Sequence, residues 1–255
     1  MSPVTLVWLA ALGLAVGSFL NVCISRLPAR ESIAFPGSRC PRCRAPIRWY
    51  DNMPVASFLM LGGRCRSCRA PISVRYPLVE IATSAAFVAH GAVIDDPWLL
   101  AQRLLFSALL VTLFGTDLET QRLPNVLTYP GLAAGLASSL WLPPGLVTSL
   151  LGAALGAAIP WGIRWVWFKA RGVEAMGLGD VKMLAMIGAF LGWQQVWLVL
   201  LFSSLAGAVV GLGLTVVGRR SLQSRLPFGT FLALAALAAS LSGERLIDWY
   251  LTLYP

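Results

Sequence analysis

The chain alternates long apolar runs with short polar segments. Residues 1–25, 123–163 and 183–218 each contain no Asp, Glu, Lys or Arg. A helix needs about 20 apolar residues to cross a bilayer, and uncharged runs of this length are not expected in the core helices of a water-soluble fold. The pattern therefore predicts an all-α, polytopic bundle of membrane-spanning helices.

Polar and proline-rich breaks divide the chain into about eight transmembrane helices. Four segments are each predicted to form one span: residues 1–22, 78–93, 98–116 and 228–241. Residues 123–163 are predicted to form two spans, which Pro143-Pro144-Gly145 divides. Residues 180–218 are also predicted to form two spans, with the division near Gly192. The sixth span is too short to cross about 30 Å of hydrocarbon at about 1.5 Å per residue. We therefore expect it to continue past Gly192, to tilt, or to be shielded by neighbouring helices.

Composition agrees with this pattern. Hydrophobic residues make up 57% of the chain and charged residues 12%, with a mean hydropathy of +0.73. A soluble domain carries about twice that charged fraction. The composition excludes a cytosolic enzyme, a disordered chain and a small disulfide scaffold.

The basic residues orient the predicted spans. The net charge is +9, and ten arginines fall between Arg26 and Arg75. The positive-inside rule places that segment in the cytoplasm, and the same path leaves only Arg103 and Arg245 of the 20 basic residues outside. We therefore expect both termini on the side of the membrane opposite the cytoplasm. We expect the basic residues to set the orientation of the helices and to contact anionic membrane lipid, and not to bind nucleic acid. The expected domains are a first span (1–22), a cytoplasmic loop (23–77) and a membrane bundle (78–255).

Four of the five cysteines form a repeated motif in the loop. Cys40 and Cys43 make one C-x2-C pair, Cys65 and Cys68 the other, and each pair is followed by Arg-Ala-Pro-Ile. Each C-x2-C pair with its Arg-Ala-Pro-Ile segment forms one knuckle, and two such knuckles predict that four thiolates meet at one point. Zinc is the ion expected to bind there in a structural role. The alternative is two disulfides, which a reducing cytoplasmic loop disfavours, and iron in place of zinc stays open. The sequence thus predicts a small zinc-knuckle domain whose metal orders a loop with few apolar residues.

Two aspartates fall at the same leaflet edge on the predicted topology. Asp117 ends the third span, and Asp180 closes Gly177-Leu178-Gly179-Asp180 at the start of the sixth. In aspartic proteolysis one ionised carboxylate deprotonates a water while a protonated one polarises the scissile carbonyl. The alternative for an aspartate at a helix end is a capping role. We expect a catalytic pair, with Gly177 and Gly179 leaving room for substrate backbone beside Asp180.

Three other charged residues lie near these features. Glu174 and Lys182 flank the Gly-x-Gly-Asp segment and are expected to support the site by tuning Asp180 or contacting the substrate. Glu80 falls just inside the second span, where an ion pair with an arginine is the expected role.

With these motifs in this order, the chain resembles the type IV prepilin peptidases, also called leader peptidases. The resemblance rests on the segments Gly17-Ser18-Phe19-Leu20-Asn21-Val22, Arg26-Leu27-Pro28, the double cysteine motif, Asp117-Leu118, Leu123-Pro124-Asn125, residues 174–182 and Pro227-Phe228-Gly229. Thr230 stands where a proline is common and Ala175 where glycine is frequent. Neither departure is expected to touch the two aspartates.

The resemblance implies a GxGD-type intramembrane aspartic peptidase of the bacterial inner membrane, with Asp117 and Asp180 as its catalytic pair. Its substrates would be prepilins or pseudopilins of type IV pili or type II secretion, cut after a glycine on the cytoplasmic face. It also implies N-methylation of the new amino terminus with S-adenosylmethionine. No glycine-rich dinucleotide-binding fingerprint is present, so that cofactor is expected between the cytoplasmic loop and the membrane edge, at residues that the sequence does not identify.

Three alternatives remain open at this point. The first is a zinc-containing membrane methyltransferase without peptidase activity. The second is a transporter or channel that uses the two aspartates as ion ligands, which would favour acids near the bilayer midplane and broken helices. The third is a presenilin-like protease with other substrates, which the cysteine loop disfavours.

Overall fold

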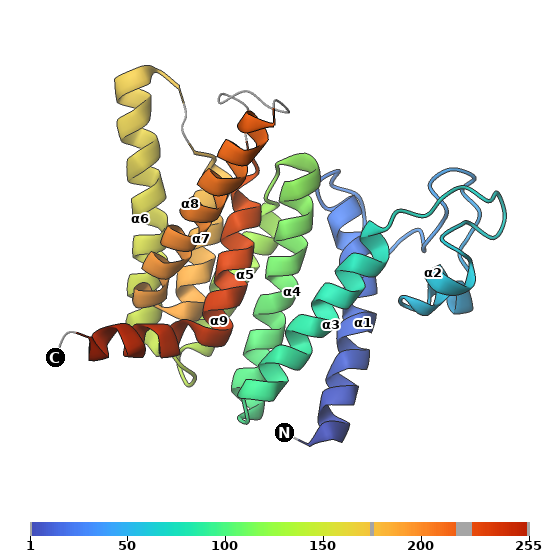
Figure 1. The fold of residues 1–255 in the computed structure, drawn as a ribbon, viewed down its shortest axis with the longest axis horizontal. Helices are drawn as coiled ribbons and strands as arrows, with labels where there is room; N and C mark the ends of the chain where they lie inside the picture. The colour runs from blue at the N-terminus through green and yellow to red at the C-terminus, as the bar shows by residue number, and fades with distance from the viewer. Residues whose placement is uncertain (1, 174–175, 218–225, 254–255) are drawn as a thin grey trace. The chain divides into compact units, whose positions relative to one another are not determined.

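The computed structural model is all-helical, as predicted, and describes residues 2–173, 176–217 and 226–253. Five of its helices are long and apolar enough to cross a membrane, which agrees with a multi-pass membrane protein (Figure 1). They are α1 (Pro3–Arg26), α4 (Pro97–Thr120), α6 (Leu146–Arg171), α8 (Trp193–Val216) and α9 (Phe228–Thr252).

The other three predicted spans coincide with α3 (Arg75–Val93), α5 (Asn125–Ser138) and α7 (Leu178–Leu191). These helices are shorter or less apolar than the five, so the count of about eight stays a prediction. The loop also forms two short helices, η1 (Trp49–Asn52) and α2 (Ala56–Met60). The chain divides into two compact units, residues 1–112 and 113–255, and each is described by itself.

In the first unit, α1 and α3 pack closely through small residues. A Cβ atom at Gly13 would lie 2.5 Å from the Cα of Ser84, and one at Gly17 would lie 2.6 Å from the Cα of Glu80. The Ser84 hydroxyl donates a hydrogen bond to the carbonyl of Ala10 at 3.0 Å. Small residues permit such backbone approach in membrane helices, so glycine is required at both positions of α1.

In the second unit, α7 is the central helix. Every side chain from 183 to 191 is buried, and α7 packs against α5, α6, α8 and α9. It ends at Leu191, and α8 begins at Trp193 after Gly192, whose φ is +83° (Figure 1). Shielding by neighbouring helices, one of the three explanations for a short sixth span, agrees with the structure, because protein covers residues 183–191.

Glycines also set the contact between α6 and α7. A Cβ atom at Gly188 would lie 2.1 Å from the carbonyl oxygen of Gly152, and one at Gly156 would lie 2.4 Å from the carbonyl oxygen of Leu184. The two backbones therefore touch directly. This contact holds α7 in one place and so fixes the position of its first turn, which carries Asp180.

Candidate active site and metal centre

The four loop cysteines lie together, as predicted. Their sulfur atoms are all within 4.8 Å of one another, and the Sγ atoms of Cys40 and Cys68 are 3.8 Å apart. A tetrahedral ion bound at about 2.3 Å requires sulfur atoms about 3.8 Å apart. All five cysteines are free thiols. The donor set and its spacing fit a metal ion held by four cysteines, and the disulfide alternative is not formed.

The two knuckles repeat one backbone pattern. The N–H of Cys40 donates to the carbonyl of Ala45 at 3.0 Å, and the N–H of Cys65 donates to that of Ala70 at 2.8 Å. A hydrogen bond from the backbone of Cys43 lowers the pKa of the Cys40 thiol to about 6. The thiolate is the form that binds a metal. The pKa of the other ligand of this knuckle is shifted in the opposite direction, because the hydrogen bond at the backbone of Ala45, which lowers the pKa of the Cys43 thiol, is outweighed by the neighbouring cysteine side chains, which raise it to about 11.

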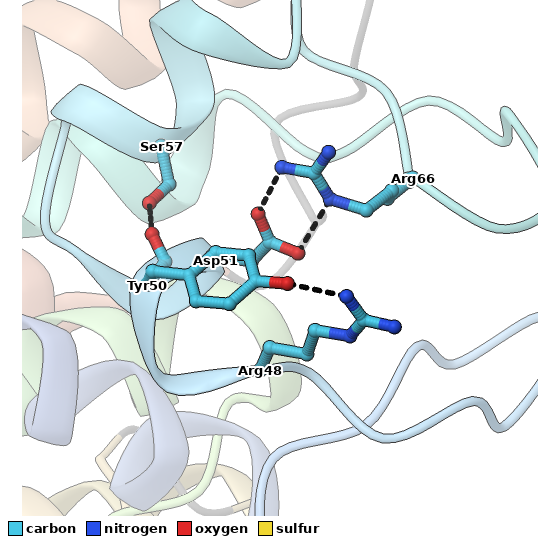
Figure 2. A network of polar contacts seen from close by, with 5 residues as sticks. All are labelled: Arg48, Tyr50, Asp51, Ser57 and Arg66. Carbon is cyan, nitrogen blue, oxygen red and sulfur yellow. Dashed lines mark hydrogen bonds and ion pairs between the residues drawn. The ribbon is translucent and has the colours of Figure 1, made fainter.

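A polar network braces the loop beside the knuckles (Figure 2). Arg66 donates two hydrogen bonds to the carboxylate of Asp51, at 2.8 and 2.6 Å, and this pairing lowers the pKa of Asp51. Arg48 donates to the Tyr50 hydroxyl, and the Ser57 hydroxyl donates to the Tyr50 carbonyl at 2.9 Å. Because Arg66 lies within the second cysteine pair, the network ties that knuckle to η1 and α2.

Asp117 is buried in the last turn of α4, with 5% of its surface exposed. Its Oδ2 atom accepts a hydrogen bond from the backbone N–H of Thr230, at 2.9 Å, in the first turn of α9. A Cβ atom at Gly229 would lie 2.9 Å from the same oxygen. The carboxylate of Asp117 therefore contacts the first turn of α9. Only a glycine at position 229 leaves enough space for it.

This contact corrects one expectation. Thr230 does touch the aspartate pair, because the first turn of a helix has free N–H groups and these face Asp117. The contact runs through the backbone, so residue type alone did not reveal it. The available signal was Pro227-Phe228-Gly229 directly before an apolar run, which is typical of a helix start.

Asp180 is the third residue of α7 and is partly buried. Its Oδ2 atom accepts a hydrogen bond from the N–H of Gly177 at 3.2 Å. Gly177 is exposed, whereas a Cβ atom at Gly179 would lie 3.0 Å from the side chain of Leu123. Gly179 thus packs closely against Leu123, and the room that the two glycines leave for a substrate backbone stays a prediction.

The structure brings the two aspartates to the same end of the second unit. The side chain of Leu123 lies against both Gly179 and Gly229, so the turn before Asp180 and the helix start that holds Asp117 share one neighbour. Two carboxyl groups on neighbouring helix ends are the residue types that acid–base hydrolysis requires.

The two flanking residues are Lys182, which has partners on α5, and Glu174. The Nζ atom of Lys182 donates to Oδ1 of Asn125 at 3.0 Å and lies 5.2 Å from the ring centre of Tyr129. It therefore ties α7 to α5, and its support of the site, by tuning Asp180 or contacting the substrate, stays a prediction. Glu174 lies outside the described residues.

Glu80 has a backbone partner instead of the expected arginine. Its Oε2 atom accepts a hydrogen bond from the N–H of Val55 at 2.8 Å. The side chain of this α3 residue thereby anchors the start of α2, which follows Val55 directly.

Two family profiles match the chain. Residues 11–93 match the bacterial peptidase A24 N-terminal domain, and residues 104–212 match the type IV leader peptidase family. No solved structure gave a significant match.

Curated proteins named prepilin leader peptidase/N-methyltransferase are similar over most of the chain. The protein from Aeromonas salmonicida is 38% identical and that from Pseudomonas aeruginosa 39%, each over 94% of this chain and 91% of the relative. The protein from Myxococcus xanthus is 46% identical over 82% of this chain and 63% of the relative.

Proposed function

This chain belongs to the type IV leader peptidase family, and we propose that it removes the leader peptide of prepilins or pseudopilins and N-methylates the new amino terminus. The observation that carries the proposal is that the turn before Asp180 and the helix start that holds Asp117 both lie against Leu123, through Gly179 and Gly229. The names of its relatives support both activities. A methyltransferase without peptidase activity would have no need of this pair.

Asp117 and Asp180 are the catalytic residues of this proposal. One carboxylate takes a proton from a water molecule, whose oxygen attacks the scissile carbonyl carbon, while the other, protonated, polarises the carbonyl oxygen. The peptide bond then breaks, the amine receives a proton, and the leader leaves with a glycine carboxylate at its end. Because Gly177 is exposed beside the Asp180 carboxylate, a substrate backbone has room to approach there.

We also propose the membrane arrangement that the charge pattern predicts. About eight helices span the bacterial inner membrane, and lipid surrounds the bundle. Residues 23–77 form a cytoplasmic domain between the first span and the membrane bundle of residues 78–255. The cut would occur on the cytoplasmic face, in substrates of type IV pilus or type II secretion systems. The sorting of basic residues along the sequence supports this orientation, and no nucleic acid takes part.

The direct test is to incubate the purified protein with a prepilin, with and without S-adenosylmethionine, and to weigh the products. We expect a mass loss equal to the leader in both samples, and a gain of one methyl group only where S-adenosylmethionine is present. Methyl transfer to an already mature pilin, with no cleavage of the prepilin, would instead support the methyltransferase without peptidase activity.

Gly229→Ala is expected to slow cleavage by roughly 10- to 100-fold, because a displacement of about 1 Å at a catalytic group has effects of this size. The new Cβ would lie 2.9 Å from Oδ2 of Asp117 and must displace the carboxylate. The initial rate of prepilin cleavage measures the effect. Gly162→Ala is the matched control, since a Cβ there meets nothing within 4 Å. A Gly229→Ala enzyme as fast as this control would show that the position of Asp117 on α9 is unimportant.

The occupant of the four-cysteine site is proposed to be structural zinc, held by Cys40, Cys43, Cys65 and Cys68. Zinc would supply no step of the reaction and would hold the loop in its fold.

We expect Cys43→Ser to weaken zinc binding by at least ~100-fold, since it removes one of four ligands. Plasma mass spectrometry of the purified protein measures the metal per chain. Cys23→Ser is the control, because Cys23 is buried in α1, outside the cluster, and it should retain zinc. Iron in the wild-type protein, or full zinc in Cys43→Ser, would overturn the assignment.

A further inference from the structure

Arg164 is a basic residue inside a helix that is long and apolar enough to cross a membrane. The charged residues of α6 are Arg164, Lys169 and Arg171, and the last two occupy its final turn, where a basic side chain reaches the lipid headgroups. Arg164 comes seven residues before Arg171, which places it roughly 10 Å further from that helix end at about 1.5 Å per residue. A charge at this depth is costly and indicates a specific partner.

A backbone partner of Arg164 lies in the segment that leads into α7. The Nη1 atom of Arg164, which is half-buried, donates a hydrogen bond to the carbonyl oxygen of Met176 at 2.8 Å. Met176 is followed by Gly177, the residue that caps the start of α7. A hydrogen bond from a charged donor is roughly twice as strong as a neutral one. The guanidinium group of α6 therefore holds the backbone at the start of α7.

A single peptide group joins Arg164 to Asp180. The carbonyl of Met176 and the N–H of Gly177 belong to the same planar peptide unit and point in opposite directions. Arg164 binds the oxygen of this unit at 2.8 Å, and Oδ2 of Asp180 accepts a hydrogen bond from its N–H at 3.2 Å. Hydrogen bonds in such a chain polarise and strengthen one another. The positive charge on the carbonyl side therefore makes the N–H a better donor to the aspartate.

The peptide group between Met176 and Gly177 needs such a restraint. Gly177 is exposed, and a glycine leaves its backbone dihedral angles free to change. If this peptide group rotated, its N–H would turn away from Asp180 and its carbonyl oxygen would face the carboxylate. The hydrogen bond from Arg164 to the carbonyl oxygen opposes that rotation, because rotation would break it.

We propose that Arg164 is a positioning residue for Asp180, an inference that rests on the peptidase half of the proposed function. Arg164 orients the peptide group of Met176 and Gly177, and the N–H of Gly177 then holds the Asp180 carboxylate in the direction that the reaction requires. The guanidinium group stays protonated throughout, so Arg164 transfers no proton and acts through Asp180.

The first test compares kcat and KM for prepilin cleavage by the purified full-length protein. We expect Arg164→Met to lower kcat roughly 10- to 100-fold, the effect of displacing a catalytic group by about 1 Å. KM should change less than ~2-fold, because the interaction that is lost does not bind the substrate. Arg164→Lys keeps a charged donor and should lose less than ~5-fold in kcat.

Arg171→Met is the matched control, because it makes the same change in the same helix. Arg171 is exposed in the last turn of α6 and lies 5.2 Å from the ring centre of Trp167. This variant should have the kcat and KM of the wild type.

A second measurement observes the Gly177 N–H directly and needs no turnover. Met176-Gly177 is the only Met-Gly pair in the sequence, so protein with carbon-13 at the methionine carbonyls and nitrogen-15 in the glycines gives one carbonyl-filtered amide peak by NMR. We expect the Gly177 amide proton to move upfield in Arg164→Met and in Asp180→Asn, because each change weakens its hydrogen bond. It should move less far in Arg164→Lys and stay in place in Arg171→Met.

Three results would overturn the proposal. They are a wild-type kcat in Arg164→Met, a rise in KM at constant kcat, and a Gly177 proton that does not move in that variant. If Arg164→Met yields no folded protein, Arg164→Lys decides, and an unmoved Gly177 proton there overturns the proposal. A wild-type protein that cleaves no prepilin defeats the proposed function, whereas cleavage at the wild-type rate by Arg164→Met defeats this inference alone.

Discussion

Asp117→Asn and Asp180→Asn are each expected to lower the rate of prepilin cleavage by at least ~1,000-fold, because an amide can neither take a proton from water nor hold one for the substrate carbonyl. Asparagine has the size of aspartate, and at position 117 its oxygen can still accept from the N–H of Thr230. The helix ends should therefore keep their geometry. Mass spectrometry of the prepilin after incubation measures the loss.

Asp248→Asn is the matched control for this pair, because it makes the same change at an exposed position near the end of α9. It should cleave at the wild-type rate. Both inactive variants should unfold at the same denaturant concentration as the wild type, which reports that they are folded. Substantial cleavage by either aspartate variant would remove that residue from the mechanism.

Gly188→Ala is expected to lower the free energy of unfolding by about 3 kcal/mol or more, an effect at the upper end for overpacked cores. Its Cβ would lie 2.1 Å from the carbonyl oxygen of Gly152, a backbone atom that cannot rotate away. The helices α6 and α7 must separate, and the buried contacts of α7 weaken along its length. Denaturant titration in detergent micelles gives the difference.

The control for this prediction is Gly213→Ala on α8, where a Cβ atom meets nothing within 4 Å. It should be as stable as the wild type or slightly more so, since alanine favours helix. Equal stability of the two variants would mean that α6 and α7 do not touch as described. Because this contact positions the first turn of α7, we also expect Gly188→Ala to lose cleavage activity.

The sequence predicted the helices well, because charges and prolines interrupt the apolar runs at nearly every helix end. Its main error was the end of α9, which was expected near residue 241 but continues to Thr252. Glu244, Arg245 and Asp248 follow the predicted span, and all three are exposed on the helix. The pattern also could not show that α7 is short because its neighbours enclose it, since burial by other helices depends on contacts distant in sequence.

The predicted site was right in its cysteine cluster, where a repeated motif encodes the geometry locally. It was incomplete around the aspartates, because the groups that position them are backbone atoms. The N–H of Thr230 donates a hydrogen bond to Asp117, and the absence of a side chain at Gly229 leaves space for its carboxylate. Neither feature involves a reactive side chain that the sequence would reveal. The contact of Lys182 with Asn125 was likewise not predictable, since it joins two helices that are distant in sequence.

A double-mutant cycle tests the central claim, that Asp117 and Asp180 act as one catalytic pair. Cleavage rates are measured for the wild type, the two single asparagine variants and the double variant in the same membrane preparation. Residues that share a proton are strongly non-additive, so we predict that the double variant is no slower than either single one. Losses that multiply in the double variant, or a single variant that retains the wild-type rate, would contradict the account.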